Sequence, residues 1–204
     1  MVLTPSTMLP LGTPLPSVQL EQVWGAQGAV GHEDRGEDWN SAALEPAPVL
    51  VLFLCAHCPF VKHIEPELSR LERDTGERLQ IVAISSNSTL THPQDGPEGL
   101  RDQAERNGWN FPYLFDASQA VARAFHAACT PDIYLFDSAH QLVYRGQLDA
   151  SRPGNDQPLD GRDLRAAIEA LLNDQPILEQ QQPSIGCNIK WPPDSAEPSA
   201  AIDR

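Results

Sequence analysis

The chain of 204 residues is poor in basic residues, and lysine is almost absent. It has 14 Lys and Arg against 28 Asp and Glu, which gives a formal net charge of −14, and its two lysines are Lys62 and Lys190. A charge of this sign repels nucleic-acid phosphates and anionic lipid headgroups. No basic patch interleaved with aromatic residues occurs. We therefore expect neither nucleic acid nor a membrane surface as a partner.

Long apolar runs are missing as well. The longest, Val49–Ala56, has eight residues, far fewer than the ~20 that a membrane-spanning helix needs. The first 16 residues have neither the positively charged start nor the apolar stretch of a secretory signal, and they lack a small-residue cleavage site. We therefore expect a soluble, cytoplasmic protein.

Cysteine is scarce, with four in the chain. Four cysteines in a chain of this size do not form a disulfide scaffold, and in a reducing compartment they indicate redox chemistry or metal binding. A glycine-rich phosphate loop, a dinucleotide fingerprint and a Ser-His-Asp order are also absent. We therefore expect no cofactor.

What is present is an alternation of apolar segments. Two unbroken apolar stretches, Val49–Leu54 and Leu79–Ser85, predict buried strands, and the spacing that follows the first predicts a helix opening near Cys58. Further strands are expected over residues 113–115, 133–136 and 142–145, and helices over 98–107, 119–125 and 164–172. This order predicts an α/β fold with a central mixed β-sheet flanked by helices on both faces.

Composition divides the chain into three parts. Residues 1–16 are expected to form an N-terminal extension and residues 17–173 the folded domain. Residues 174–204 are rich in Gln and Pro, which predicts an irregular C-terminal tail with its last ten or so residues disordered.

The sequence Cys55-Ala56-His57-Cys58 falls between a predicted strand and a predicted helix. Free N–H groups and the dipole at a helix N-terminus lower a cysteine pKa from ~8.5 to about 3.5–7.5. The thiolate is the nucleophile of disulfide exchange, and two intervening residues let a second sulfur close a ring and release a mixed-disulfide partner. The spacing predicts a redox-active dithiol, and the alternative is a pair of buried core cysteines.

Thr130-Pro131 precedes a predicted strand, where an X-Pro bond could be cis and lie against the sulfurs. Only ~5–6% of X-Pro bonds in folded proteins are cis, so spacing alone favours an ordinary trans proline. Cys129 and Cys187 are candidate additional redox residues. The alternatives are a small buried hydrophobe for Cys129 and a packing residue in the tail for Cys187.

The segment Phe53–Ile64, with the sequence FLCAHCPFVKHI, resembles the signature F-x-C-x-H-C-P-[YF]-V-K-H-I. That signature belongs to the peroxiredoxin-like (AhpC/TSA-like) branch of the thioredoxin superfamily. Segments that also resemble this branch are 83–87, 129–132, 144–146, 151–155 and 184–191. The likeness runs from about Gly12 to Trp191, and it implies a thioredoxin fold with a cis Thr130-Pro131 bond.

The resemblance implies a thiol–disulfide oxidoreductase in which Cys55 attacks and Cys58 resolves. The residues expected to shape the substrate groove are Ala56, His57, Pro59, Thr130 and Pro131. The substrate would be a disulfide-containing protein or a small thiol or peroxide, and an unidentified electron donor would recycle the pair.

Two other functions remain open. True peroxiredoxins carry T-x-x-C, whose cysteine aligns with Cys58, so a thiol-dependent peroxidase with Cys58 as the peroxidatic residue is one. Cys55 takes the place of the threonine, which removes a hydroxyl that helps to hold peroxide. The other is a metal-binding or redox-sensing protein that holds Cu(I) or Zn(II) through Cys55 and Cys58. A four-ligand zinc site would need a second CxxC pair, which the chain lacks, so we expect no metal.

Overall fold

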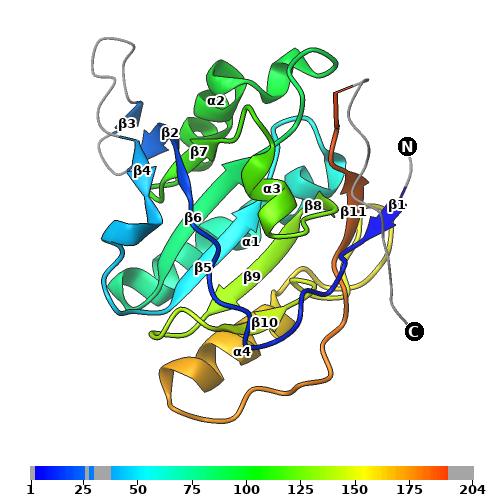
Figure 1. Ribbon diagram of the computed structural model, residues 1–204. Coiled ribbons are helices and arrows are strands. Elements are labelled where there is room, and N and C mark those ends of the chain that lie inside the picture. The colour runs from blue at the N-terminus through cyan, green and yellow to red at the C-terminus, as the bar shows by residue number, and fades with distance from the viewer. Residues whose placement is uncertain (1–2, 26–27, 30–37, 193–204) are drawn as a thin grey trace, which may run out of the picture.

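The computed structural model describes residues 3–25, 28–29 and 38–192 (Figure 1). Its α-helices are α1 (Pro59–Thr75), α2 (Pro97–Asn107), α3 (Ala120–Ala124) and α4 (Arg162–Leu172). Its strands are β1 (Leu3–Pro5), β2 (Gln19–Gly25), β3 (Gly28–Ala29), β4 (Trp39–Asn40), β5 (Val49–Phe53), β6 (Gln80–Ser85), β7 (Tyr113–Phe115), β8 (Cys129–Thr130), β9 (Asp132–Phe136), β10 (Leu142–Arg145) and β11 (Ile185–Asn188). Among these described helices, none is long and apolar enough to cross a membrane.

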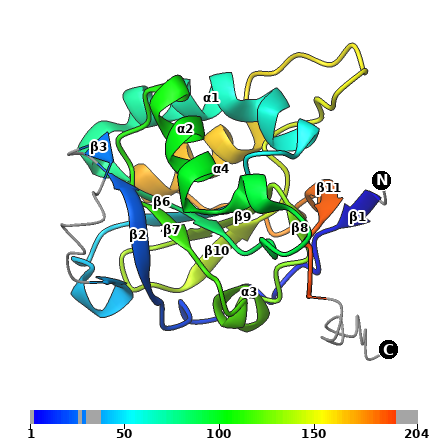
Figure 2. The same ribbon diagram turned by 90° about the horizontal axis from the view of Figure 1, so that it is seen from above.

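The main sheet has the strand order β10-β9-β5-β6-β7-β2-β3, with β4 paired to β2. The pairs β5–β6 and β6–β7 are parallel, whereas β9 runs antiparallel to β5, so the sheet is mixed. Helices α1, α2 and α4 cover one face, and α3 lies on the other (Figure 2). The predicted mixed sheet with helices on both faces is confirmed.

Strand β5 lies in the middle of this sheet and is buried on both faces. Its Leu50 and Leu52 pack in one core cluster with Leu68 of α1. Phe53 points into the cluster on the opposite face, where its ring meets that of Phe125 edge to face at 5.2 Å. Packing on both faces fixes the end of β5, and hence the start of the segment that carries the cysteine pair.

Helix α1 begins directly after Cys58, which is its N-cap residue. Pro59 occupies the first turn, where a missing N–H costs nothing and the fixed φ favours helix. The helix continues across Pro66 to Gly76, whose φ of 54° is accessible to glycine. Apolar residues at helical spacing are buried against the sheet: Val61, Ile64, Leu68 and Leu71.

Both ends of the described chain meet in a second, three-stranded sheet with the order β1-β11-β8 (Figure 1). Leu3 pairs with Cys187 on one side of β11, and Cys187 pairs with Thr130 on the other. Because β8 leads directly into β9 of the main sheet, this small sheet ties both termini to the domain.

The expectation of an irregular tail over residues 174–204 is wrong for Ile185–Asn188, which form β11. Four residues that include a glycine give no readable alternation, and their pairing partners lie far away in the sequence. The N-terminal extension likewise contributes β1 to the fold. The predicted disorder of the last ten residues falls outside the described residues.

Candidate redox site

The end of β5 and the start of α1 bring Cys55 and Cys58 together, and both side chains are fully buried. The Sγ of Cys55 lies 3.3 Å from the Oγ1 of Thr130, and the Sγ of Cys58 lies 3.3 Å from the carbonyl oxygen of Thr130. The Thr130-Pro131 peptide bond is cis, as the resemblance implied. The CxxC pair and Thr130-Pro131 thus form one site, although Cys58 and Thr130 are 72 residues apart in the sequence.

A third cysteine contacts the pair, and the fourth is bonded to the backbone. The Sγ of Cys187 lies 3.0 Å from the Sγ of Cys58, within S–H···S hydrogen-bond distance. Cys129 is buried, and its thiol donates to the carbonyl oxygen of Pro131 at 3.5 Å. Of the two candidate additional redox residues, the structure therefore places Cys187 in contact with the pair and gives Cys129 a backbone partner.

The surroundings of Cys58 favour its thiolate. The thiol of Cys55 has the largest effect on the pKa of Cys58 and lowers it by donating a hydrogen bond. Burial opposes this shift, but Cys187, the backbone N–H of Val61 and Thr130 lower the pKa further, to about 5. The N-cap position adds the positive end of the helix dipole. These groups therefore favour the thiolate form of Cys58.

Cys55 is held as a thiol. Burial raises the pKa of Cys55 well above its ordinary value, and its hydrogen bond to Cys58 and the nearby carboxylate of Asp95 raise it further. The structure therefore favours the thiolate on Cys58, whereas the expected order of roles has Cys55 attacking and Cys58 resolving. The reason is that Cys58, at the start of α1, accepts several hydrogen bonds, whereas Cys55 lies near the carboxylate of Asp95.

The segment between the two cysteines is anchored by Asp95, which sequence reasoning missed. Its buried carboxylate accepts hydrogen bonds from the backbone N–H of His57 at 3.0 Å and from the Nδ2 of Asn87 at 2.8 Å. A third oxygen–nitrogen contact joins it to the Nδ1 of His57 at 2.5 Å. Burial raises the pKa of Asp95, but these hydrogen bonds outweigh it and hold the pKa below its ordinary value. Only its place in a polar loop before a helix could have marked this residue.

A network of buried polar side chains binds the backbone of Cys55, and the sequence did not predict it. The Nε2 of Gln103 donates to the carbonyl oxygen of Cys55 at 3.3 Å and to the Oε1 of Glu65 at 2.8 Å. The hydroxyl of Tyr113 donates to the Oε1 of Gln103 at 3.1 Å. These bonds join α1, α2 and β7 at the site and hold the backbone of Cys55 in place.

The five residues expected to line a substrate groove divide into two groups. Ala56, His57 and Pro59 are partly exposed. Thr130 and Pro131 are buried, because β11 pairs along β8 and covers them. The groove as predicted is therefore open on the side of the cysteine loop and closed on the side of the proline.

The sequence profile of the AhpC/TSA family matches residues 11–145, which is more than half of the chain. The chain belongs to the AhpC/TSA family. No curated protein matches it.

Several solved structures are similar to this chain. An uncharacterized conserved protein from Geobacillus kaustophilus is 44% identical, with a TM-score of 0.87 over 96% of this chain and 99% of that one. A hypothetical protein from Sinorhizobium meliloti is 40% identical, with a TM-score of 0.83 over 93% and 99%. The thioredoxin domain of a Bacteroides vulgatus thiol-disulfide oxidoreductase is 16% identical, with a TM-score of 0.55 over 78% and 99%, and shows that the fold is that of thioredoxin.

One group of side chains in this AhpC/TSA protein has the composition of a metal site. Donor atoms of Cys55, His57 and Asp95 all lie within 4.8 Å of one another. His57 and Asp95 already bond to each other, so an ion would have to displace that contact. Cys58, which the metal-binding alternative also required, is not in this group.

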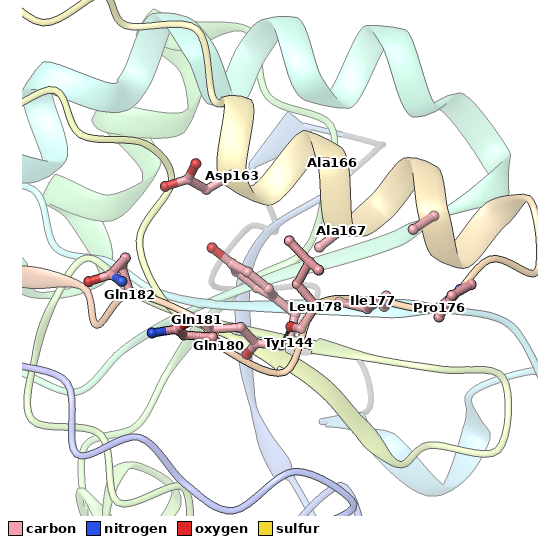
Figure 3. Close-up of a pocket in the computed structure, with 11 residues that line it drawn as sticks. Tyr144, Asp163, Ala166, Ala167, Pro176, Ile177, Leu178, Gln180, Gln181 and Gln182 are labelled. Carbon is pink, nitrogen blue, oxygen red and sulfur yellow. Dashed lines mark hydrogen bonds between the residues drawn. The ribbon is translucent and has the colours of Figure 1, made fainter.

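A cavity of about 220 Å³ lies between α4 and the segment that follows it. Figure 3 shows Tyr144, Ala167 and Leu178 around it, with Asp163 at its edge. None of the four cysteines lines this cavity. It is therefore separate from the redox site.

Proposed function

We propose that this AhpC/TSA family member is a thiol–disulfide oxidoreductase in which Cys58 attacks and Cys55 resolves. The observation that carries the proposal is the environment of Cys58, whose pKa of about 5 makes it a thiolate beside a protonated thiol. A thiolate is the attacking species in disulfide exchange, and a low-pKa sulfur is also the better leaving group. Both properties suit Cys58 to form and release mixed disulfides.

The exchange proceeds in two balanced steps. Cys58 attacks one sulfur of a substrate disulfide, and the other substrate sulfur leaves as a thiolate and takes a proton from solvent. Cys55 then loses its proton and attacks the Sγ of Cys58, which forms the Cys55–Cys58 disulfide and expels the second substrate thiol. A dithiol electron donor reverses this disulfide and completes the cycle.

The partly exposed side of the cysteine loop supports the approach of substrate from the direction of Ala56, His57 and Pro59. The contact with Asp95 fixes the ring of His57 beside the pair. We propose disulfide-containing proteins as the substrate class, and the thiol-disulfide oxidoreductase domain with the same fold is consistent with that choice.

The test is reduction of a model protein disulfide, with dithiothreitol as the electron source. Cys58→Ser should lower the rate at least tenfold because the attacking thiolate is lost, and Cys55→Ser should stop turnover after the first mixed disulfide. Cys129→Ser is the matched control and should retain the wild-type rate, because the Cys129 thiol faces the carbonyl oxygen of Pro131. A Cys58→Ser protein as active as the wild type would overturn the proposal.

The same thiolate supports a second candidate, a thiol-dependent peroxidase. Cys58 would attack a peroxide oxygen to form a sulfenic acid and release an alcohol or water, and Cys55 would then condense with it to give the disulfide and water. Peroxide consumption and disulfide reduction, measured on the same preparation, separate the two activities. Consumption of peroxide within seconds, with slow exchange toward disulfides, would favour the peroxidase.

A further inference from the structure

Strand β11 runs along β8, the two-residue strand just before Pro131. Cys187 is in register with Thr130, and Asn188 with Cys129. On its other side β11 is paired with β1, and Figures 1 and 2 both show it between these two strands. The chain thus places its own strand, with a cysteine in the middle, at the edge of the redox site.

The sequence of β11 allows an unusually close approach to this edge. A Cβ on Gly186 would lie 2.1 Å from the carbonyl oxygen of Thr130, so a residue with a side chain would push the strand away. Hydrogen bonds anchor the chain on both sides of β11. The hydroxyl of Ser184 donates to the carbonyl oxygen of Gly146 at 2.7 Å, and the N–H of Lys190 donates to the Oδ1 of Asn87 at 2.8 Å. The position of Cys187 is therefore built into the fold.

This placement leaves Cys58 with two thiol neighbours, Cys55 within its own loop and Cys187 from β11. We propose that Cys187 is a second resolving thiol, which forms a disulfide with Cys58 and fastens β11 across the site. The proposal rests on the proposed attack of Cys58 on substrate disulfides.

The chemistry needs no reactant beyond those of the proposed function. In the mixed disulfide between Cys58 and a substrate, Cys187 loses its proton and attacks the Sγ of Cys58, which forms the Cys58–Cys187 bond and expels the substrate thiolate. The expelled thiolate takes up a proton. Attack by Cys55 on the same Sγ converts this disulfide to Cys55–Cys58 and returns Cys187 to the thiol, without net oxidation or reduction.

The charges around Cys187 suit this sequence of events. Burial raises the pKa of Cys187 to about 12, and hydrogen bonding to Cys58 and the charge on Cys58 raise it as well. The positive charge of Lys190 acts in the opposite direction. Once Cys58 is consumed in a mixed disulfide its negative charge is gone, while Lys190 remains. Cys187 therefore becomes easier to ionise at the stage when it is needed.

The test uses a full-length protein that retains two thiols, made by the substitutions Cys55→Ser and Cys129→Ser. The matched control adds Cys187→Ser and retains Cys58 alone. Both proteins are treated with oxidised glutathione and analysed by intact mass and peptide mapping. The two-thiol protein should end as a Cys58–Cys187 disulfide without glutathione, and the control should end with glutathione on Cys58. Equal glutathionylation of both proteins would overturn the proposal.

A second arm separates failure of this proposal from failure of the proposed function. If neither protein takes up glutathione, the proposed attack by Cys58 is wrong, and the pairing is then judged with diamide, which oxidises two neighbouring thiols directly to a disulfide. A Cys58–Cys187 crosslink in monomeric, folded protein supports the pairing, and its absence overturns it. Circular dichroism before oxidation confirms that each variant is folded.

Discussion

The reactivity proposed for Cys58 comes from the groups that surround it and not from exposure, since its side chain is fully buried. The thiols of Cys55 and Cys187 can both donate to its sulfur, and it occupies the N-cap position of α1. Together these groups outweigh the cost of burying a negative charge. A buried thiolate of this kind is reactive only toward partners that reach it through the cysteine loop.

The first prediction concerns the ionisation of Cys58. Titration of the reduced protein, followed by the far-ultraviolet absorbance of thiolates, should show one cysteine ionising near pH 5. Cys58→Ser should abolish this step, and Cys129→Ser should leave it in place. Cys55→Ala should shift it to higher pH, because the thiol that donates to the thiolate is removed. A first thiolate that forms only above pH 8 would contradict the assignment.

Asp132, directly after Pro131, is another buried ionisable residue, and it bonds to Tyr134 of the core cluster on the face opposite α1. Its Oδ2 accepts from the N–H of Ala128 at 3.2 Å and from the hydroxyl of Tyr134 at 3.0 Å. Burial raises the pKa of Asp132 to about 6, against the opposing effect of hydrogen bonds. The folded protein therefore holds a proton there that the unfolded chain releases at lower pH.

The second prediction follows from the sign of that shift. The raised pKa of Asp132 stabilises the fold fully below pH 3.8, and this contribution is lost as the pH rises through about 6. A shift of this size corresponds to about 3 kcal/mol. Asp132→Asn removes the ionisation. The free energy of unfolding of the variant, relative to that of the wild type, should therefore increase as the pH rises from 4 to 7. Urea unfolding of both proteins across this pH range measures the difference in free energy of unfolding. A difference that does not change with pH would contradict the prediction.

At the scale of elements, the redox site is the meeting point of one strand end, one helix start and the small sheet β1-β11-β8. The third prediction tests the close approach within that sheet. Gly186→Ala places a Cβ against the carbonyl oxygen of Thr130, so it should lower the free energy of unfolding by about 2 kcal/mol and weaken Cys58–Cys187 crosslinking. Ile185→Ala, at an exposed position of the same strand, is the control and should change both little.

The regular elements were largely predictable from the sequence. The apolar runs and helical spacings located β5, β6, β7, β9, β10 and the four α-helices to within one or two residues at each predicted end. These elements bury many apolar residues at a fixed period, which leaves a readable pattern. Strand β11 leaves none, because its four residues depend on tertiary partners at Leu3 and Thr130.

Of the site, the sequence identified the CxxC pair and Thr130-Pro131 but not the ionisation of the pair. Which cysteine is the thiolate depends on donors from β11 and α1 and on the carboxylate of Asp95. These groups come together only in the folded chain. Asp95 itself lies in a polar loop where an acidic residue is ordinary, so no local pattern distinguishes it.

At the scale of the whole molecule, two core clusters on opposite faces of the sheet hold a chain with a formal net charge of −14. Like charges at this density repel one another more in the compact state than in the unfolded chain. The fourth prediction is that the unfolding temperature rises as sodium chloride is increased from low to about physiological concentration, because salt screens this repulsion. Sucrose at matched osmolality controls for excluded-volume effects, and a fall in unfolding temperature with salt would contradict the prediction.

Trapping a mixed disulfide shows which sulfur of the CxxC pair attacks a substrate disulfide. The protein is prepared with Cys129→Ser and Cys187→Ser, so that only the CxxC pair remains, and either Cys55 or Cys58 is then changed to serine. Each variant is exposed briefly to a model disulfide and mapped by peptide mass spectrometry. We predict a stable mixed disulfide on Cys58 in the variant that lacks Cys55, and little adduct on Cys55 in the variant that lacks Cys58. Faster and more complete trapping on Cys55 would show that Cys55, and not Cys58, is the attacking residue.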